Sequence, residues 1–147
     1  MKKATGLLFT AFISLYSIDS MAKTAKIDDS KDVSECIKKF KNENIECLDD
    51  VLHNSEEQLN KAYLSKLTKI KKTSPDEWWM GDEQQKKEVI DSFIANQKKW
   101  IEYRDSFCGV ALWSYQNSDH LGEAQTRCEI NMNTRLLEEI DLIQIPS

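Results

Sequence analysis

Residues 46–72 read ECLDDVLHNSEEQLNKAYLSKLTKIKK, and this stretch decides the fold. Its apolar side chains recur at spacings of three and four residues, which places them on one face of an α-helix. Two later stretches, residues 83–107 and 119–143, show the same periodicity, and a shorter one covers residues 33–41. No stretch alternates apolar and polar residues over the length of a strand. The sequence therefore predicts an all-α protein.

The expected architecture is a small antiparallel helical bundle of three long helices plus one or two short ones, stapled by two disulfides. Each long helix has an apolar stripe that would face the core. In chain order the three stripes are Leu48, Val51, Leu52, Leu59, Ala62, Tyr63, Leu67 and Ile70; Val89, Ile90, Phe93, Ile94, Gln97, Trp100, Ile101, Arg104 and Phe107; and Leu121, Ala124, Cys128, Met132, Leu136, Ile140 and Ile143.

The first residues have the pattern of a cleaved secretory signal. Lys2 and Lys3 precede an almost uncharged apolar run, which is too short to span a bilayer comfortably. Small residues then lead up to Ala22, so we expect cleavage after it, with no membrane anchor left behind. The alternative is an ordinary first helix. The predicted division is a signal peptide (1–22), a polar linker (23–32) and one helical domain (33–147).

The cysteines are Cys36, Cys47, Cys108 and Cys128. An even number in an exported chain indicates two disulfides, for which three pairings are possible. We expect Cys36–Cys47 and Cys108–Cys128. In one continuous helix the first two would lie about 16 Å apart, whereas a disulfide needs Cα atoms within about 7 Å. This pairing therefore requires a turn between them, for which residues 42–44 are suitable.

Charge and motif content narrow the class of function. After signal cleavage the chain would carry 18 Lys and Arg against 24 Asp and Glu, a net charge of −6. This balance argues against nucleic-acid binding and suits a basic protein partner, although it also serves solubility. Neither His53 nor His120 forms a ligand pattern with cysteine, and no nucleophile motif or phosphate loop is present. We expect no enzyme, no cofactor and no metal site.

Residues 74–81, SPDEWWMG, are the most unusual stretch of the chain. Ser74, Pro75 and Glu77 fit the capped start of a single helical turn, and Gly81 can end it in the left-handed conformation. Such a turn would present a cluster of large side chains, Trp78, Trp79 and Met80. Neighbouring side chains on a helix point about 100° apart, so one indole would stay exposed as an anchor for a partner. The alternative is a hydrophobic lid on the end of the bundle.

Residues 97–108, QKKWIEYRDSFC, form a second constellation. Its spacing puts Gln97, Trp100, Arg104 and Cys108 on one helical face. The indole N–H of a buried tryptophan needs a partner, and the arginine should meet an acid, Glu56 or Glu139. We interpret this face as structural, with a ligand site as the alternative.

Three elements in this order resemble the LprI-like lysozyme inhibitor N-terminal domain family. They are LNKAY at residues 59–63, QKKWIEYRDSFC at residues 97–108, and a threonine–arginine pair after the last cysteine. The resemblance spans Cys36 to about Leu142 and implies an exported helical domain with structural disulfides that inhibits lysozyme. It offers no catalytic residues. We interpret its motif residues as structural: Leu59, Asn60, Tyr63, Gln97, Trp100, Tyr103, Arg104, Asp105, Thr134 and Arg135.

The expected function is therefore that of a non-catalytic binding protein of the bacterial cell envelope, periplasmic or secreted. It would inhibit, or give immunity against, a lysozyme-type enzyme that degrades peptidoglycan. Animal lysozymes are basic, so an acidic inhibitor would gain association rate. The alternative is a structural or adaptor module that binds another envelope protein. The sequence identifies neither the partner nor the oligomeric state.

Overall fold

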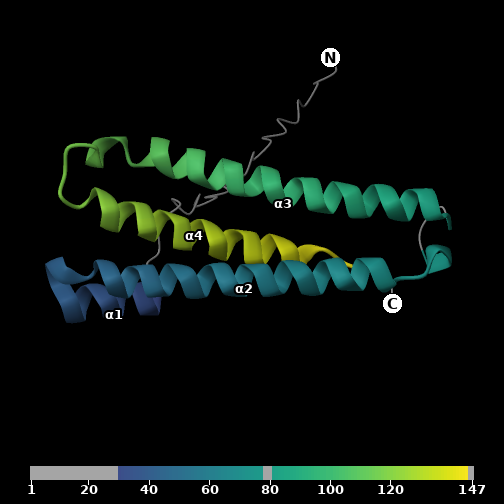
Figure 1. Cartoon of the computed structure of the whole chain (residues 1–147), viewed down its shortest axis with the longest axis horizontal. Coiled ribbons are helices and arrows are strands. Elements are labelled where there is room, and N and C mark those ends of the chain that lie inside the picture. The colour runs from purple at the N-terminus through teal and green to yellow at the C-terminus, as the bar shows by residue number, and fades with distance from the viewer. Residues whose placement is uncertain (1–29, 78–80, 146–147) are drawn as a thin grey trace, which may run out of the picture.

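The computed structural model describes residues 30–77 and 81–145, and within them the regular structure is entirely helical. The helices are α1 (Lys31–Phe40), α2 (Ile45–Lys72), α3 (Glu83–Ala111) and α4 (Leu121–Leu142). Single 3₁₀ turns follow α1, α2 and α3. Helices α2 and α3 run antiparallel along the full length of the molecule, and α1 lies beside the start of α2 (Figure 1). The predicted all-α bundle is confirmed.

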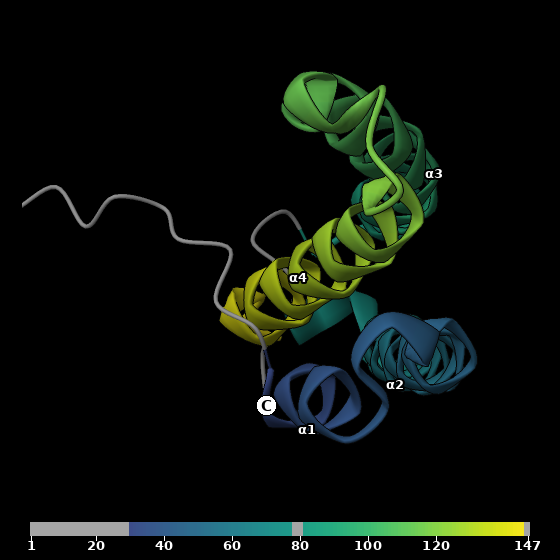
Figure 2. The same ribbon diagram turned by 90° about the vertical axis from the view of Figure 1, so that its left-hand side faces the viewer.

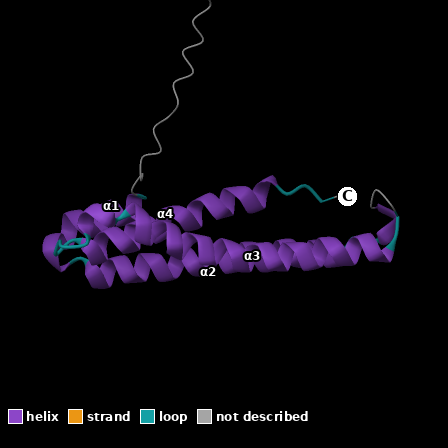
Figure 3. Ribbon diagram, turned by 90° about the horizontal axis from the view of Figure 1, so that it is seen from above, coloured by secondary structure: helices purple, strands orange, loops and turns teal. Residues whose placement is uncertain are grey.

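Helix α4 lies between α3 and the α1–α2 pair, as the end view shows (Figure 2). Seen from above, α4 ends well before the far end of α2 and α3, and only the chain that follows it continues in that direction (Figure 3). One half of the molecule is therefore a packed bundle. The other half is a pair of long helices accompanied by the segment after Leu142.

The helix ends follow local capping chemistry. Helix α1 begins two residues before the predicted position because the Ser30 hydroxyl accepts a hydrogen bond from the Val33 N–H (3.2 Å). Asp82 caps α3 in the same way by accepting from the Gln85 N–H (2.6 Å). Helix α3 ends at Ala111, four residues beyond the predicted end. Continuing the helix to this point brings the following residue, Leu112, into the core.

The predicted turn between the first two cysteines is present. A 3₁₀ turn spans Lys41–Glu43, and Lys41 has a φ of 50°. Asn44 is buried after this turn, and its side-chain amide donates to the Glu123 carboxylate on α4 (3.0 Å). Both predicted disulfides are confirmed, with Cα–Cα distances of 5.7 Å for Cys36–Cys47 and 5.8 Å for Cys108–Cys128. The first joins α1 to α2, and the second joins α3 to α4.

The core consists of three clusters of buried apolar side chains, and α4 contributes to all of them. Trp100 is half-buried and packs against two of the clusters. The clusters are Cys108, Leu112, Ala124, Cys128 and Met132; Val33, Cys36, Leu48 and Ile130; and Leu59, Leu136 and Ile140.

The predicted stripes are correct for α2 and wrong in part for α3. All eight predicted positions of α2 are buried or half-buried. On α3, however, Ile94, Ile101 and Phe107 are exposed, and so is Ile143 just after α4. The reason is that α3 lies at the edge of the bundle, so a narrower face of it is covered than its apolar residues would allow. Only Arg104 and Cys108 of α3 are fully buried.

A polar network crosses the three long helices at their centre. The Arg104 guanidinium on α3 donates through Nη1 to the Asn133 side-chain oxygen on α4 (3.0 Å) and to Glu56 on α2 (3.1 Å). Its Nε donates to Asp105 (2.8 Å). Asn133, which is 0% exposed, donates in turn to the Ser55 hydroxyl on α2 (2.9 Å). The expected partner Glu56 is thus confirmed, whereas Glu139 lies elsewhere, beside a groove between α3 and α4.

Charge pairing keeps this arginine protonated. Burial alone would lower the pKa of Arg104, but the hydrogen bonds and charges of Asp105 and Glu56 outweigh it and raise the pKa above its ordinary value. The network therefore connects α3 to α2 through an ion pair and to α4 through a hydrogen bond from the charged guanidinium to a neutral amide.

Removal of the second disulfide tests how α3 is held. We expect Cys108→Ala with Cys128→Ala to lower the free energy of unfolding by about 3 kcal/mol, because the closed loop no longer restricts the unfolded chain. Urea unfolding followed by far-ultraviolet circular dichroism measures this. The matched control, Cys36→Ala with Cys47→Ala, removes a disulfide that closes a shorter loop. Its free energy of unfolding should therefore fall by slightly less. Unchanged stability in both variants would contradict the structural role of the disulfides.

Truncation of the arginine tests the polar network. Arg104→Ala should lower the free energy of unfolding by about 2–3 kcal/mol, because it leaves Asn133 buried and without this donor. Lys98→Ala, at an exposed position of the same helix, should change it by less than about 0.5 kcal/mol. Thermal unfolding of both variants beside the unmodified protein gives the comparison. Equal melting temperatures would show that the network contributes nothing.

Candidate functional site

The predicted partner-binding residues Trp78, Trp79 and Met80 lie outside the described residues. Their described neighbours form the expected single turn, but the Ser74 hydroxyl does not cap it. Pro75–Glu77 forms a single 3₁₀ turn, and the Ser74 hydroxyl donates to the Asp76 carboxylate, which lowers the pKa of Asp76. Gly81 has a φ of 63°, which confirms the predicted left-handed conformation. This connection lies at the end of the molecule where α2 stops and α3 begins (Figure 1).

The LNKAY motif places two side chains in the core and leaves its asparagine outside. Leu59 is buried against α4, and Asn60 is exposed. The Tyr63 ring stacks on Phe93 of α3, with ring centroids 5.1 Å apart. The motif therefore joins α2 to both other long helices.

An apolar groove of about 440 Å³ runs between α3 and α4 and is lined by motif residues Gln97, Trp100 and Tyr103. Leu136 and Ile140 form its α4 side. The other α4 motif residues make local contacts. The Thr134 hydroxyl donates to the Ile130 carbonyl (3.1 Å), and Arg135 lies 3.9 Å from the Met132 sulfur. Of the three motif residues that line the groove, Tyr103 is the most exposed, at 55%.

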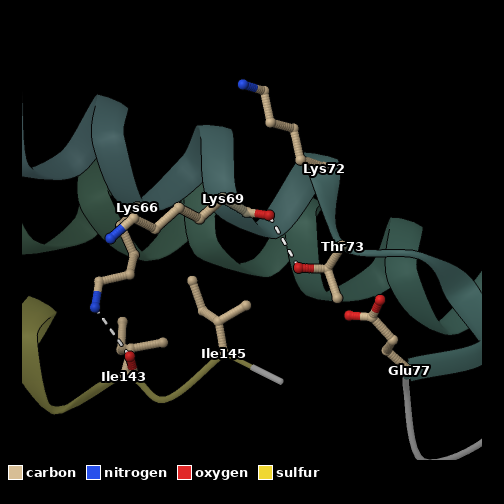
Figure 4. A pocket seen from close by; sticks show the side chains of 7 residues that line it. All are labelled: Lys66, Lys69, Lys72, Thr73, Glu77, Ile143 and Ile145. Carbon is tan, nitrogen blue, oxygen red and sulfur yellow. Dashed lines mark hydrogen bonds between the residues drawn. The ribbon is translucent and has the colours of Figure 1, made fainter. Parts of the chain in front are cut away.

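A second groove, of about 470 Å³, lies at the C-terminal end of α2 beside the segment that follows α4 (Figure 4). Lys66, Lys69 and Lys72 border it together with Ile143 and Ile145. The Lys66 ammonium donates to the Ile143 carbonyl (2.9 Å), which ties this segment to α2. The groove is cationic and is therefore unsuited to a basic partner.

Helix α2 separates its charges along its length. From residue 43 to residue 57 the chain has six acidic side chains and no Lys or Arg: Glu43, Glu46, Asp49, Asp50, Glu56 and Glu57. From residue 61 to residue 72 it has five lysines and no acid: Lys61, Lys66, Lys69, Lys71 and Lys72. This order matches the helix dipole, which favours acids at the N-terminus and bases at the C-terminus. Helix α2 is consequently acidic over its first half and basic over its last three turns.

The C-terminal end of α3 exposes a group of large apolar side chains that sequence reasoning missed. Phe107 was predicted to face the core, and Val110, Trp113 and Tyr115 lie beyond the predicted helix, but all four are exposed. The available signal was the composition of residues 106–118, which contain no charged side chain in a chain that is 31% charged.

Within residues 30–77 and 81–145, no three His, Cys, Asp or Glu side chains come together as metal ligands. No helix of this part is long and apolar enough to cross a membrane. Two disulfides are typical of a protein outside the cytoplasm.

Comparison with curated proteins and with solved structures gave no match. The comparison with family models gave one result, described as lysozyme inhibitor LprI, over residues 36–139. This range contains both disulfides, the Arg104 network and every residue of the motifs. The chain therefore belongs to the lysozyme inhibitor LprI family.

Proposed function

We propose that this protein is exported to the bacterial periplasm, where it binds a lysozyme-type muramidase and blocks its action on peptidoglycan. Whether the enzyme comes from a host or a competitor, the protein would act as an inhibitor or an immunity factor of the same kind. The observation that carries this proposal is the family match over residues 36–139. The paired cysteines and the predicted signal peptide support export.

The charge distribution supports a basic partner. Glu46, Asp49 and Asp50 are exposed in the acidic half of α2, and the only cationic side chains near them in sequence belong to α1 and the turn that follows it. A concentrated acidic end attracts a basic enzyme over several ångströms and raises its association rate. Because this attraction acts through solvent, dissolved salt weakens it.

If the protein inhibits by covering the catalytic cleft of the enzyme, the charge of its contact surface must also suit that cleft. The active site of a glycosidase of this class contains two carboxylates. An acidic side chain inserted there would be repelled, so the surface that enters or covers the cleft should be uncharged or cationic. The acidic residues of α2 would therefore guide the approach without contacting the catalytic carboxylates.

A titration against a basic animal lysozyme tests the proposed function. We expect stoichiometric inhibition of peptidoglycan hydrolysis by the oxidised protein, with an association rate that falls about tenfold or more between low and physiological salt. Lysozyme activity and surface plasmon resonance give the two readouts. If a folded protein neither binds nor inhibits, the muramidase function is wrong, and an adaptor for another envelope protein becomes the favoured function.

Matched charge reversals locate the electrostatic effect. Glu46→Lys with Asp50→Lys should slow association several-fold. Glu138→Lys with Asp141→Lys makes the same change in net charge at the end of α4 and should slow it much less. Equal slowing by both pairs would show that only net charge matters and that the acidic half of α2 has no special role.

The sequence-based candidate Trp78–Met80 is tested separately. If these side chains anchor the enzyme, Trp78→Ala with Trp79→Ala should weaken inhibition by about tenfold or more, because large aromatic side chains dominate interfaces. Inhibition constants and circular dichroism spectra are measured together. Full inhibition by the folded double variant would exclude this segment from the contact surface.

A further inference from the structure

Residues 106–118 are the longest stretch without a charged side chain in residues 30–77 and 81–145. Burial does not explain this composition, because only Cys108 and Leu112 of the stretch are buried. On a surface that faces only water, charged residues would be expected at some of the other positions. Depletion of charge on an exposed surface is instead characteristic of the centre of a protein interface.

Large apolar side chains follow one another along this surface. Tyr103, Phe107 and Val110 succeed each other at spacings of four and three, which brings each beside the next on α3. Trp113 follows in the 3₁₀ turn just after the helix. The rings of Tyr103 and Phe107 lie 5.8 Å apart. Tyr103 is 55% exposed, Val110 73% and Trp113 80%. Tryptophan and tyrosine are the side chains that most often dominate binding energy.

Gly109 lies among these side chains, and no contact within the described residues requires a glycine at this position. Gly109 is within α3, where glycine costs up to about 1 kcal/mol relative to alanine. A Cβ atom added at Gly109 would meet nothing within 4 Å, so no neighbouring part of the protein requires its small size. Since glycine lacks a side chain, Gly109 leaves a shallow hollow in the helix surface beside Val110 and one turn after Ser106. A close approach by a partner would account for such a glycine.

The surroundings of this surface are acidic. Glu102 and Asp105 are exposed on the same stretch of α3. From residue 100 to residue 145 the chain has eight acidic side chains against three arginines, and one of these, Arg104, is buried. The same end of the molecule contains the start of α2 with its acidic half (Figures 1 and 3). An uncharged centre beside acidic residues is complementary to a basic protein with an apolar contact region.

We propose that the exposed end of α3 and the turn after it, formed by Tyr103, Phe107, Gly109, Val110 and Trp113, are the surface that contacts the muramidase. This inference rests on the proposed function and assigns enzyme binding to one surface of the protein. Trp113 and Val110 provide the apolar anchors, and Gly109 allows the enzyme to approach the helix backbone. The acidic half of α2 guides the enzyme to this end of the molecule. The uncharged surface then meets the cleft without adding a carboxylate to the two already there.

Three variants test this surface, each with a readout of folding. Trp113→Ala and Val110→Asp should each raise the inhibition constant against the basic lysozyme tenfold or more, with unchanged circular dichroism. Gly109→Met has open space within the chain and a better helix former, so its melting temperature should equal or exceed that of the unmodified protein. Its inhibition constant should nevertheless rise tenfold or more, because the hollow is filled.

The controls use Leu142, which is 77% exposed at the opposite end of α4. Leu142→Ala and Leu142→Asp remove comparable exposed apolar surface and should leave the inhibition constant within twofold. Inhibition that is preserved in all three α3 variants would overturn the surface assignment and leave the proposed function intact. Absence of inhibition by the unmodified protein would refute both. A dimer that Val110→Asp dissociates, with inhibition unchanged, would assign this surface to a second copy of the chain and overturn the proposal.

Discussion

The contact between Arg104 and Asn133 is the interaction on which the arrangement of the helices depends. Asn133 is completely buried, and its amide connects the guanidinium of α3 to the Ser55 hydroxyl of α2. If one partner were removed, the other would remain buried with an unpaired polar group, which is more costly than the loss of the hydrogen bond itself. Apolar packing could tolerate a shift of α3 along its axis, but this network could not, because its hydrogen bonds require one register. Together with the Cys108–Cys128 disulfide it fixes α3 through the only two fully buried side chains of that helix.

Because so few contacts hold α3, much of its surface is available for other purposes. A helix in the centre of a bundle must cover most of its apolar residues, and α4 does so in all three core clusters. Helix α3 is fixed by an ionic network, a disulfide and the half-buried ring of Trp100. Its exposed apolar side chains therefore contribute little to the core. They lower solubility without stabilising the fold, which is the pattern that functional surfaces share.

The sequence predicted those features that depend on local geometry. Helical periodicity located the four helices, and the distance argument required the turn that brings Cys36 and Cys47 together. The cost of burying an unpaired charge predicted an acidic partner for Arg104, and of the two candidates Glu56 and Glu139 the structure has Glu56. Periodicity failed for Ile101 and Phe107 because it shows which residues share a face, and it does not show whether a second helix covers that face. The answer depends on where α4 lies, and no local pattern contains that information.

The exposed end of α3 escaped prediction for a related reason. An uncharged stretch that includes Val110 and Leu112 is expected in a core or on a contact surface, and composition alone does not separate the two. Burial separates them, because Leu112 is in the core whereas Trp113, the next residue, is outside it. The proposed surface reconciles an acidic inhibitor with a cleft that contains carboxylates. In this proposal the acidic residues of α2 act at a distance, where attraction to a basic enzyme needs no contact. The residues that would touch the enzyme carry no charge, so they neither repel the catalytic carboxylates nor require desolvation of an ion. In this proposal, attraction and contact therefore belong to different parts of the fold. The acidic half of α2 attracts the enzyme, and the exposed end of α3, which the other helices leave uncovered, contacts it.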